Sequence, residues 1–109
     1  MRIYISGPIT GVQNFETAFR KAAGKISRHG HEYVDPSHLD GYIPNATHDF
    51  YIHLAFATLP QCDAIYLLRG WENSAGAQQE LLYAKAHNLT IYEEDKYGES
   101  VPELPTRRP

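Results

Sequence analysis

The apolar run from Ala64 to Leu68 is the feature that most constrains the fold of this chain. Each of its residues is apolar or aromatic, and the run follows directly on the charged Asp63. A run of this length without alternating polar residues is typical of a strand in a parallel sheet whose two faces are both covered. We therefore expect a parallel sheet with this segment near its centre.

Strand-like and helix-like segments alternate around this run. Short apolar runs predict further strands, and apolar residues at helical spacing predict helices. The expected strands are 3–5, 32–34, 64–68 and 89–92, and the expected helices are 14–28, 47–59 and 74–87. This alternation predicts an α/β fold: a Rossmann-like three-layer sandwich with a four- to five-stranded, mainly parallel sheet and helices on both faces.

Local signals predict where the helices begin and end. Asn14 can cap the first helix, and Gly30 suits the point where that helix stops. Pro60 marks the end of the second helix, because proline cannot continue a helix. The buried face of this second helix is expected to carry Phe50 and Leu54.

Two segments show no periodic pattern. Residues 37–45 contain glycine and proline and predict a loop. The stretch from 94 to 109 is acidic and rich in proline, which predicts a loosely packed tail. We therefore expect one domain over residues 1–93, followed by a tail over residues 94–109.

Composition excludes several classes of protein. The 109 residues suit a single domain, and a formal charge of -3 gives no electrostatic reason to expect duplex nucleic acid as a partner. Cys62 has no second cysteine to pair with, which favours a reducing compartment. The first residues enter a strand at once, without an apolar span or a basic leader. We expect a cytoplasmic protein that does not bind a membrane.

The loop after the first strand is a candidate binding loop, because ligands of open parallel sheets bind at the carboxyl ends of the strands. Its glycines let a ligand approach the backbone, and its hydroxyl groups can form hydrogen bonds. The loop consists of Ser6, Gly7, Pro8, Ile9, Thr10 and Gly11. It matches neither the phosphate-binding loop nor the dinucleotide fingerprint, so neither a kinase nor a dehydrogenase is supported. A purely structural tight turn explains these glycines equally well.

The segment that leads into the third helix is a second candidate. Ser74 can cap this helix, and the exposed amides at a helix start attract anions such as phosphate. Gly76 and Glu80 are four residues apart and share a helix face, so the missing side chain of Gly76 leaves room for a sugar beside the carboxylate. An exposed glutamate on a solvated helix is the alternative interpretation.

Two aromatic residues are further candidate ligand contacts. Tyr4 and Trp71 can stack on a nucleobase, although packing in the core or at its rim explains Trp71 equally well. Cys62 is interpreted as a small buried hydrophobic residue. We expect no metal and no cofactor, because the histidines show no recognised ligand spacing. These histidines include His29, His31, His48, His53 and His87.

Three segments together resemble the nucleoside 2-deoxyribosyltransferase-like superfamily: Ile3 to Gly11, Cys62 to Leu68, and Gly70 to Glu80. The resemblance spans nearly all of residues 2–92 and is more specific to a branch of short proteins frequent in phages and prophages, related to deoxynucleoside 5'-monophosphate N-glycosidases. It implies a flavodoxin-like sheet, and cleavage or transfer at the N-glycosidic bond of nucleosides or nucleoside 5'-monophosphates. It also implies a homo-oligomer, because members of this superfamily commonly complete the site from a second subunit.

The same resemblance implies roles for individual residues. Glu80 matches the glutamate nucleophile, and Tyr4 and Gly7 match a tyrosine of the first strand and a glycine of the following loop. Ser74 matches a serine that binds phosphate in the monophosphate hydrolases. Asp63 opens the central strand and is a further candidate, either for substrate binding or for support of the strand end.

One position departs from the superfamily pattern. Members usually carry an aspartate eight positions before the aspartate that opens the central strand, and this chain has Ala55 there; Asp49 and His53 lie nearby. A second acidic group normally assists the leaving base when a carboxylate attacks the sugar. Three functions therefore stay open: an N-glycosidase or deoxyribosyltransferase, a non-catalytic protein that senses or sequesters a nucleotide in the same pocket, and an interaction module without a pocket.

Overall fold

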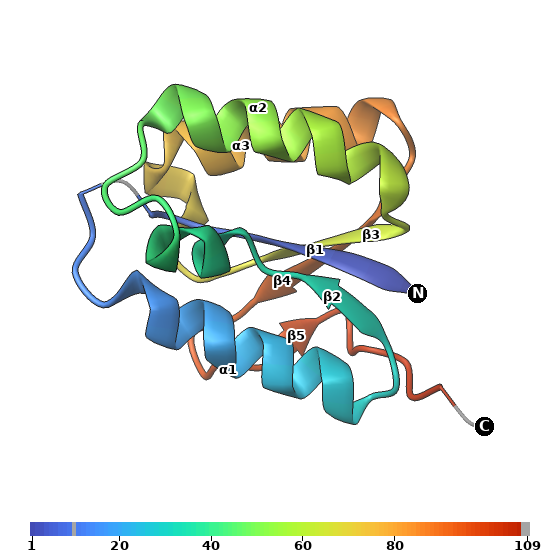
Figure 1. The fold of residues 1–109 in the computed structure, drawn as a ribbon. Helices are drawn as coiled ribbons and strands as arrows, with labels where there is room; N and C mark the ends of the chain where they lie inside the picture. Colours follow the sequence, from blue (N-terminus) through green and yellow to red (C-terminus); the bar gives the residue numbers. More distant parts are fainter. Residues whose placement is uncertain (10, 108–109) are drawn as a thin grey trace.

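A computed structural model of the chain, which describes residues 1–9 and 11–107, shows one sheet between helices (Figure 1). Its elements are β1 (Arg2–Ser6), α1 (Phe15–Arg28), β2 (Glu32–Val34), the 3-10 helix η1 (Pro36–Gly41), α2 (His48–Thr58), the 3-10 helix η2 (Leu59–Gln61), β3 (Ala64–Leu67), the 3-10 helix η3 (Trp71–Asn73), α3 (Ala75–Ala86), β4 (Thr90–Glu94) and β5 (Ser100–Val101). The predicted α/β class is confirmed. No helix in the described part of the chain has the length and apolar character needed to cross a membrane.

The sheet has five strands in the order β2-β1-β3-β4-β5. The first four are parallel, and β5 runs antiparallel to β4. Every residue of β3 is buried, and this strand lies between β1 and β4. The prediction of a mainly parallel sheet with this strand at its centre is therefore confirmed.

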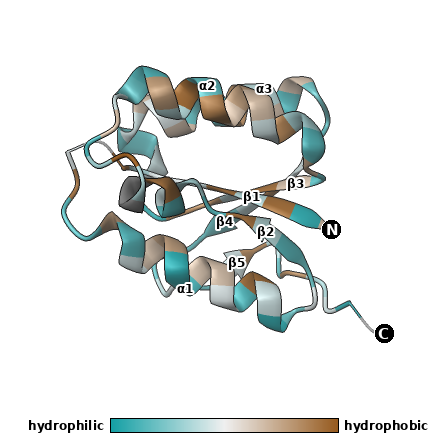
Figure 2. Cartoon of the chain, in the orientation of Figure 1, coloured by the Kyte–Doolittle hydropathy of each residue, from teal (hydrophilic) through white to brown (hydrophobic). Residues whose placement is uncertain are grey.

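Hydrophobic residues pack on both faces of the sheet, because successive side chains of a strand point to opposite faces. In Figure 1, α1 lies on one face and α2 and α3 lie on the other. The core on the α1 side is formed mainly by Ile3, Ile5, Phe19, Ala22, Ala23, Ile26, Ala64 and Tyr66. The core on the side of α2 and α3 is formed mainly by Tyr4, Ala55, Leu59, Ile65, Leu67, Leu81 and Ala84. Figure 2 shows hydrophobic residues along β1 and β3.

The helix ends confirm some of the predicted signals. Gly30 follows α1 with a φ of 87°, and its N–H donates a hydrogen bond to the carbonyl oxygen of Ser27. Thr47 caps α2, because its hydroxyl oxygen accepts a hydrogen bond from the N–H of Phe50. The predicted cap by Asn14 is wrong. This residue has a left-handed φ of 56° and its side chain makes no capping bond, whereas a capping residue normally has extended backbone.

The buried face of α2 also differs from the prediction. Tyr51 and Ala55 are buried, whereas Phe50 and Leu54 are only half-buried. The helix is rotated by about one residue from the expected orientation because α2 packs beside α3 as well as over the sheet. Apolar residues occur on several sides of α2, so its sequence alone did not determine which side would face inward.

Two segments expected to be irregular contain regular structure among their described residues. Residues 36–41 form η1, whose start is capped by the carboxylate of Asp35. The expectation of a loosely packed tail is wrong, because β5 pairs with β4 and Leu104 is only 3% exposed in the core on the α1 side. The N–H of Arg107 further donates a hydrogen bond of 2.8 Å to the carbonyl oxygen of His29. The side chain of Leu104 thus anchors the C-terminal segment to the core on the α1 side.

Candidate active site

A pocket of about 450 Å³ lies at the carboxyl end of β1, next to the first turns of α2 and α3. This is where open α/β sheets bind ligands, and the volume suits a small molecule. The predicted site residues that line it are Tyr4, Gly7, Pro8, Ile9, Ser74, Gly76 and Glu80. Two segments that are far apart in the sequence, the loop after β1 and the start of α3, are therefore brought together as expected.

Glu80 is held at this pocket by two hydroxyl groups of β1. The Tyr4 hydroxyl donates a hydrogen bond of 2.5 Å to Oε2 of Glu80, and the Ser6 hydroxyl donates one of 2.7 Å to Oε1. Tyr4 and Ser6 are two residues apart, so their side chains point to the same face of the strand. Glu80 is only 7% exposed. Both carboxylate oxygens are therefore fixed, and the alternative of an exposed glutamate is excluded.

The surroundings of Glu80 change its acidity. Burial raises the pKa of Glu80 to about 7, and the hydrogen bonds from Tyr4 and Ser6 partly oppose this rise because they favour the charged form. The pKa of Tyr4 is raised well above its ordinary range, first by burial and then by the neighbouring carboxylate. Tyr4 therefore remains a hydrogen-bond donor, while Glu80 can exist in both protonation states near neutral pH. Such a carboxyl group is suited to catalysis.

The loop after β1 is shaped by packing as well as by the pocket. A Cβ atom at Gly7 would lie 2.9 Å from Cβ of Leu68, so only glycine lets the chain pass over this side chain. Gly11 has a φ of 78°, and a Cβ atom there would have no neighbour within 4 Å. Gly11 does not appear among the residues around the pocket. Thr10, a predicted contact, lies outside the described residues.

The start of α3 forms another wall of the pocket. Ser74 caps this helix as predicted, because its hydroxyl oxygen accepts a hydrogen bond of 3.2 Å from the N–H of Ala77. Ala75 and Gly76, in the first turn, line the pocket. The first N–H groups of a helix have no partner within the helix and carry partial positive charge. This wall can therefore attract an anion or an electron-rich oxygen.

Gly76 makes room for a protein side chain. A Cβ atom at Gly76 would lie 3.2 Å from Cε1 of His48 and 3.6 Å from Cδ1 of Ile52. The missing side chain thus allows α2 to approach α3 closely. The expectation that this glycine opens space for a substrate needs correction, because His48 and Ile52 of α2 fill the space directly beside it.

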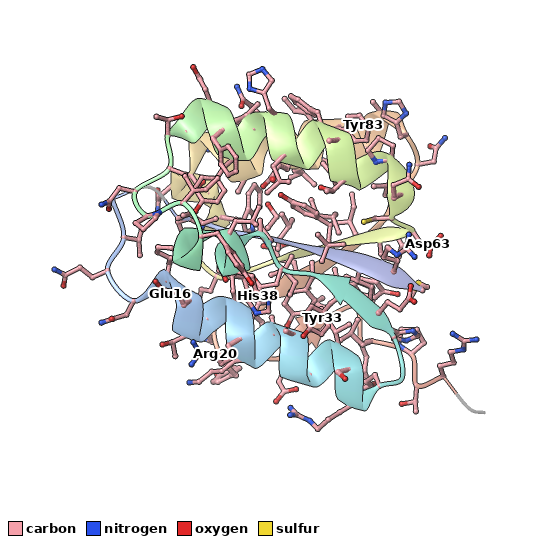
Figure 3. All side chains as sticks on the ribbon, in the orientation of Figure 1. Glu16, Arg20, Tyr33, His38, Asp63 and Tyr83 are labelled. Atoms are coloured by element: carbon pink, nitrogen blue, oxygen red, sulfur yellow. The ribbon has the colours of Figure 1, made fainter. Side chains whose placement is uncertain are left out.

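Two residues predicted to contact a ligand, Trp71 and Asp63, are not among the described residues that line the pocket with Glu80. Trp71 packs against the core on the side of α2 and α3, and its indole N–H donates a hydrogen bond of 3.1 Å to Glu93. Asp63 precedes β3 and therefore lies at the opposite end of the strands, near the start of β1 (Figure 3). Its carboxylate accepts a hydrogen bond of 2.8 Å from the N–H of Arg2. Asp63 thus supports the strand end, which was one of its two expected roles.

Comparison with models of protein families matches residues 1–93 to the family described as Domain of unknown function (DUF4406). The chain belongs to this family. No curated protein and no solved structure matches the sequence of this chain. The DUF4406 region includes all the residues that line the pocket.

Sequence reasoning missed the contribution of α2 to the pocket of this DUF4406 protein. His48, Tyr51 and Ile52 all line the pocket. A signal was present, because in an alternating α/β chain each connecting helix begins at the carboxyl edge of the sheet. The first turn of α2 was therefore as good a candidate as the first turn of α3. Ala55, one turn beyond Tyr51, is fully buried in the core.

Histidine, cysteine and acidic side chains are the groups that hold metals in proteins, and a cysteine can also act as a thiol nucleophile. Among the described residues, no group of three or more histidine, cysteine, aspartate or glutamate side chains is arranged to hold a metal ion. Cys62 is buried, and burial raises the pKa of its thiol to about 11. A thiol with so high a pKa is protonated at neutral pH and is a poor nucleophile.

Proposed function

We propose that this protein cleaves the N-glycosidic bond of a nucleoside or nucleoside 5'-monophosphate, by hydrolysis or by deoxyribosyl transfer, with Glu80 as nucleophile. The observation that carries the proposal is the Glu80 carboxyl group itself, which lines the pocket while hydroxyl groups of Tyr4 and Ser6 hold both its oxygens. The resemblance to the nucleoside 2-deoxyribosyltransferase-like superfamily supports it. We further propose that the fold is the flavodoxin-like three-layer sandwich of that superfamily.

The proposed reaction has two steps. An oxygen of Glu80 bonds to the anomeric carbon while the bond to the base breaks, and the base leaves with the electron pair and takes up a proton. Water, or a second base, then attacks the anomeric carbon of the resulting ester and releases the Glu80 carboxylate. Water completes hydrolysis, and a second base completes transfer. Burial assists the first step, because a weakly solvated carboxylate loses little hydration on reacting.

The pocket walls suit the parts of a nucleoside or nucleotide. Apolar side chains of Pro8, Ile9 and Ile52 line it and can contact a base or the carbon face of a sugar. Ser74 and the first turn of α3 supply polar groups that can hold a sugar hydroxyl or a phosphate. This division into apolar and polar walls is typical of small-molecule sites.

A second candidate function is non-catalytic binding of a nucleotide in the same pocket. One observation favours it: Glu80 is the only aspartate or glutamate among the described residues that line the pocket. Ala55, where the superfamily carries an aspartate, is 0% exposed within the core. A site with a single carboxyl group can bind a nucleotide without cleaving it.

We also propose that the protein is a homo-oligomer. The superfamily resemblance supports it, and so do two apolar side chains that remain exposed on neighbouring helices, Phe56 of α2 at 43% and Leu82 of α3 at 67%. Light scattering of the purified protein measures this directly. A monomer at all concentrations would contradict the proposal.

Release of free base tests the enzymatic proposal. The purified protein is incubated with a panel of deoxynucleosides, ribonucleosides and their 5'-monophosphates, and free base is measured by chromatography. We expect release by the wild-type protein and none by Glu80→Ala. Glu72→Ala is the matched control, because this carboxylate is exposed in the segment just before α3. Mass spectrometry of the peptide that contains Glu80 should detect the sugar ester.

Three outcomes would contradict the proposal of an enzyme with Glu80 as its nucleophile. A folded wild-type protein that releases no base from any compound excludes it. Tight binding of a nucleotide in calorimetry without release of base favours the binding function instead. Release that persists in Glu80→Ala would show that another group is the nucleophile.

A further inference from the structure

The pocket contains a second side chain that can transfer protons, the imidazole of His48. Among the described residues that line it, the ionisable side chains are Tyr4, His48, Tyr51 and Glu80. Phenols release protons only in alkaline solution, and Tyr4 already donates its proton toward Glu80. Histidine is the side chain that most often acts as a general acid or base in enzymes. His48 is therefore the described side chain on the pocket wall that can complement Glu80 in acid–base chemistry.

The position of His48 is set by its contact with α3. Cε1 and Nδ1 of His48 lie 3.2 Å and 3.7 Å from where a Cβ atom of Gly76 would be. Gly76 precedes Glu80 by four residues, which is about one turn of helix, and the two positions share a face. The imidazole therefore lies beside the same helix face as the nucleophile, about one turn away. Both residues also line the same pocket of about 450 Å³, so a substrate bound there can contact both groups.

Cleavage of an N-glycosidic bond needs a proton source for the leaving base. In a pocket with two carboxyl groups, the second carboxyl group can supply this proton. Ala55, where the superfamily carries an aspartate, has no carboxyl group and is fully buried in the core. Asp49 and His53, the other candidates on α2, are both exposed, and neither is among the residues that line the pocket. His48 begins the same helix and does line the pocket.

We propose that His48 is the general acid of the glycosidic cleavage and replaces the missing second carboxylate. The inference rests on the proposed function. As the oxygen of Glu80 bonds to the anomeric carbon, the base takes the electron pair of the broken bond, and the imidazolium of His48 transfers its proton to the base. In hydrolysis the neutral imidazole then takes a proton from the attacking water, which restores the imidazolium.

Two substrates with different leaving groups test this role. A deoxynucleoside needs a proton on its departing base, whereas 4-nitrophenyl 2-deoxyribofuranoside releases a stable phenolate without one. We expect His48→Gln to lower kcat on the deoxynucleoside by about 100- to 10,000-fold, and to change kcat on the nitrophenyl substrate by less than about tenfold. His53→Gln is the matched control. Its exposed ring lies on the same helix, with Nδ1 2.7 Å from the carbonyl oxygen of Asp49, and it should leave both rates unchanged.

Each other result has a definite meaning. Equal losses on both substrates would show that His48 only shapes the pocket, and no loss on either would show that it is not needed. A loss confined to 5'-monophosphates would make it a phosphate contact. Each of these results overturns the general-acid role while the proposed function stands. If the folded wild-type protein releases neither base nor nitrophenolate, the proposed function fails, and this inference fails with it.

Discussion

The hydroxyl of Tyr4 and the carboxylate of Glu80 are 2.5 Å apart, although the two residues are separated by 76 positions in the chain. The contact joins the middle of β1 to the face of α3 that packs over the sheet. Ser6 adds a second bond from the same strand to the same carboxylate. The position of the candidate nucleophile is therefore tied to how α3 packs over β1, and each partner can be tested separately.

Tyr4→Phe should make Glu80 a weaker acid. The Tyr4 hydroxyl lowers the pKa of Glu80 through its hydrogen bond, so its removal should raise this pKa above its value of about 7. A smaller fraction of Glu80 is then ionised at pH 7, and we expect kcat on a deoxynucleoside to fall about five- to tenfold for each tenfold decrease in the acid dissociation constant of Glu80. The acidic limb of the pH–rate profile should move to higher pH, because this limb follows the ionisation of Glu80. Tyr42→Phe, which changes a side chain that is 82% exposed, is the control. Identical pH–rate profiles for Tyr4→Phe and the wild type would contradict this role.

Glu80→Gln should change how stability depends on pH. In the folded protein the pKa of Glu80 is raised from 4.5 to about 7, so between these values the folded state binds more protons than the unfolded state. The free energy of unfolding should therefore fall as pH rises through this range, by about 3 kcal/mol from this group, and level off above it. Glutamine does not ionise, so the variant should lack this decrease. Urea denaturation at pH 5 and pH 8 measures it, and equal decreases in both proteins would refute the expectation.

Gly7→Ala should be more destabilising than Gly11→Ala. The new Cβ at position 7 would lie 2.9 Å from Cβ of Leu68, and relieving such a clash costs about 1–3 kcal/mol. At position 11 a Cβ has open space, and the cost is limited to the positive φ, about 1 kcal/mol. Thermal denaturation of the two variants compares them directly. A larger loss at position 11 would show that packing against Leu68 is not what requires Gly7.

Leu104→Ala should show that the C-terminal segment is part of the folded domain. Leu104 is 3% exposed in the core on the α1 side, and removing a buried leucine side chain costs about 2–5 kcal/mol. Val101→Ala is the control in the same segment, because Val101 is 55% exposed. It should cost less than about 1 kcal/mol. If both variants unfold at the same urea concentration as the wild type, Leu104 does not anchor the segment.

Much of the fold could be predicted from local patterns. The run at 64–68 predicted the central strand, and helical spacing predicted the three α-helices to within one or two residues of their observed ends. The loop after β1 and the start of α3 were predicted to share a site, and the pocket brings them together. The predictions of strands and helices are confirmed because they depend on residues that are neighbours in the sequence, and the two predicted segments share a pocket because of the general topology of α/β sheets.

The orientation of each element could not be predicted in the same way. Leu104 has no periodic neighbours to mark it as a core residue, yet it packs beside α1. Ala55 and His48 belong to a helix with apolar residues on several sides, and the contact of α2 with α3 directs Ala55 into the core and His48 toward the pocket. The position of Asp63 also depends on a tertiary contact. At the opposite end of the sheet, its carboxylate accepts a hydrogen bond from the N–H of Arg2.

The sequence by itself determined the three α-helices and the four parallel strands, because backbone geometry and apolar periodicity act over a few residues. Tertiary structure decided the chemical state of Glu80. As part of a sequence it was equally compatible with a solvated helix surface, and only packing over Tyr4 and Ser6 removes it from water. Burial raises the pKa of Glu80, and the two hydrogen-bond donors that partly oppose this rise come from β1, more than 70 residues away in the chain.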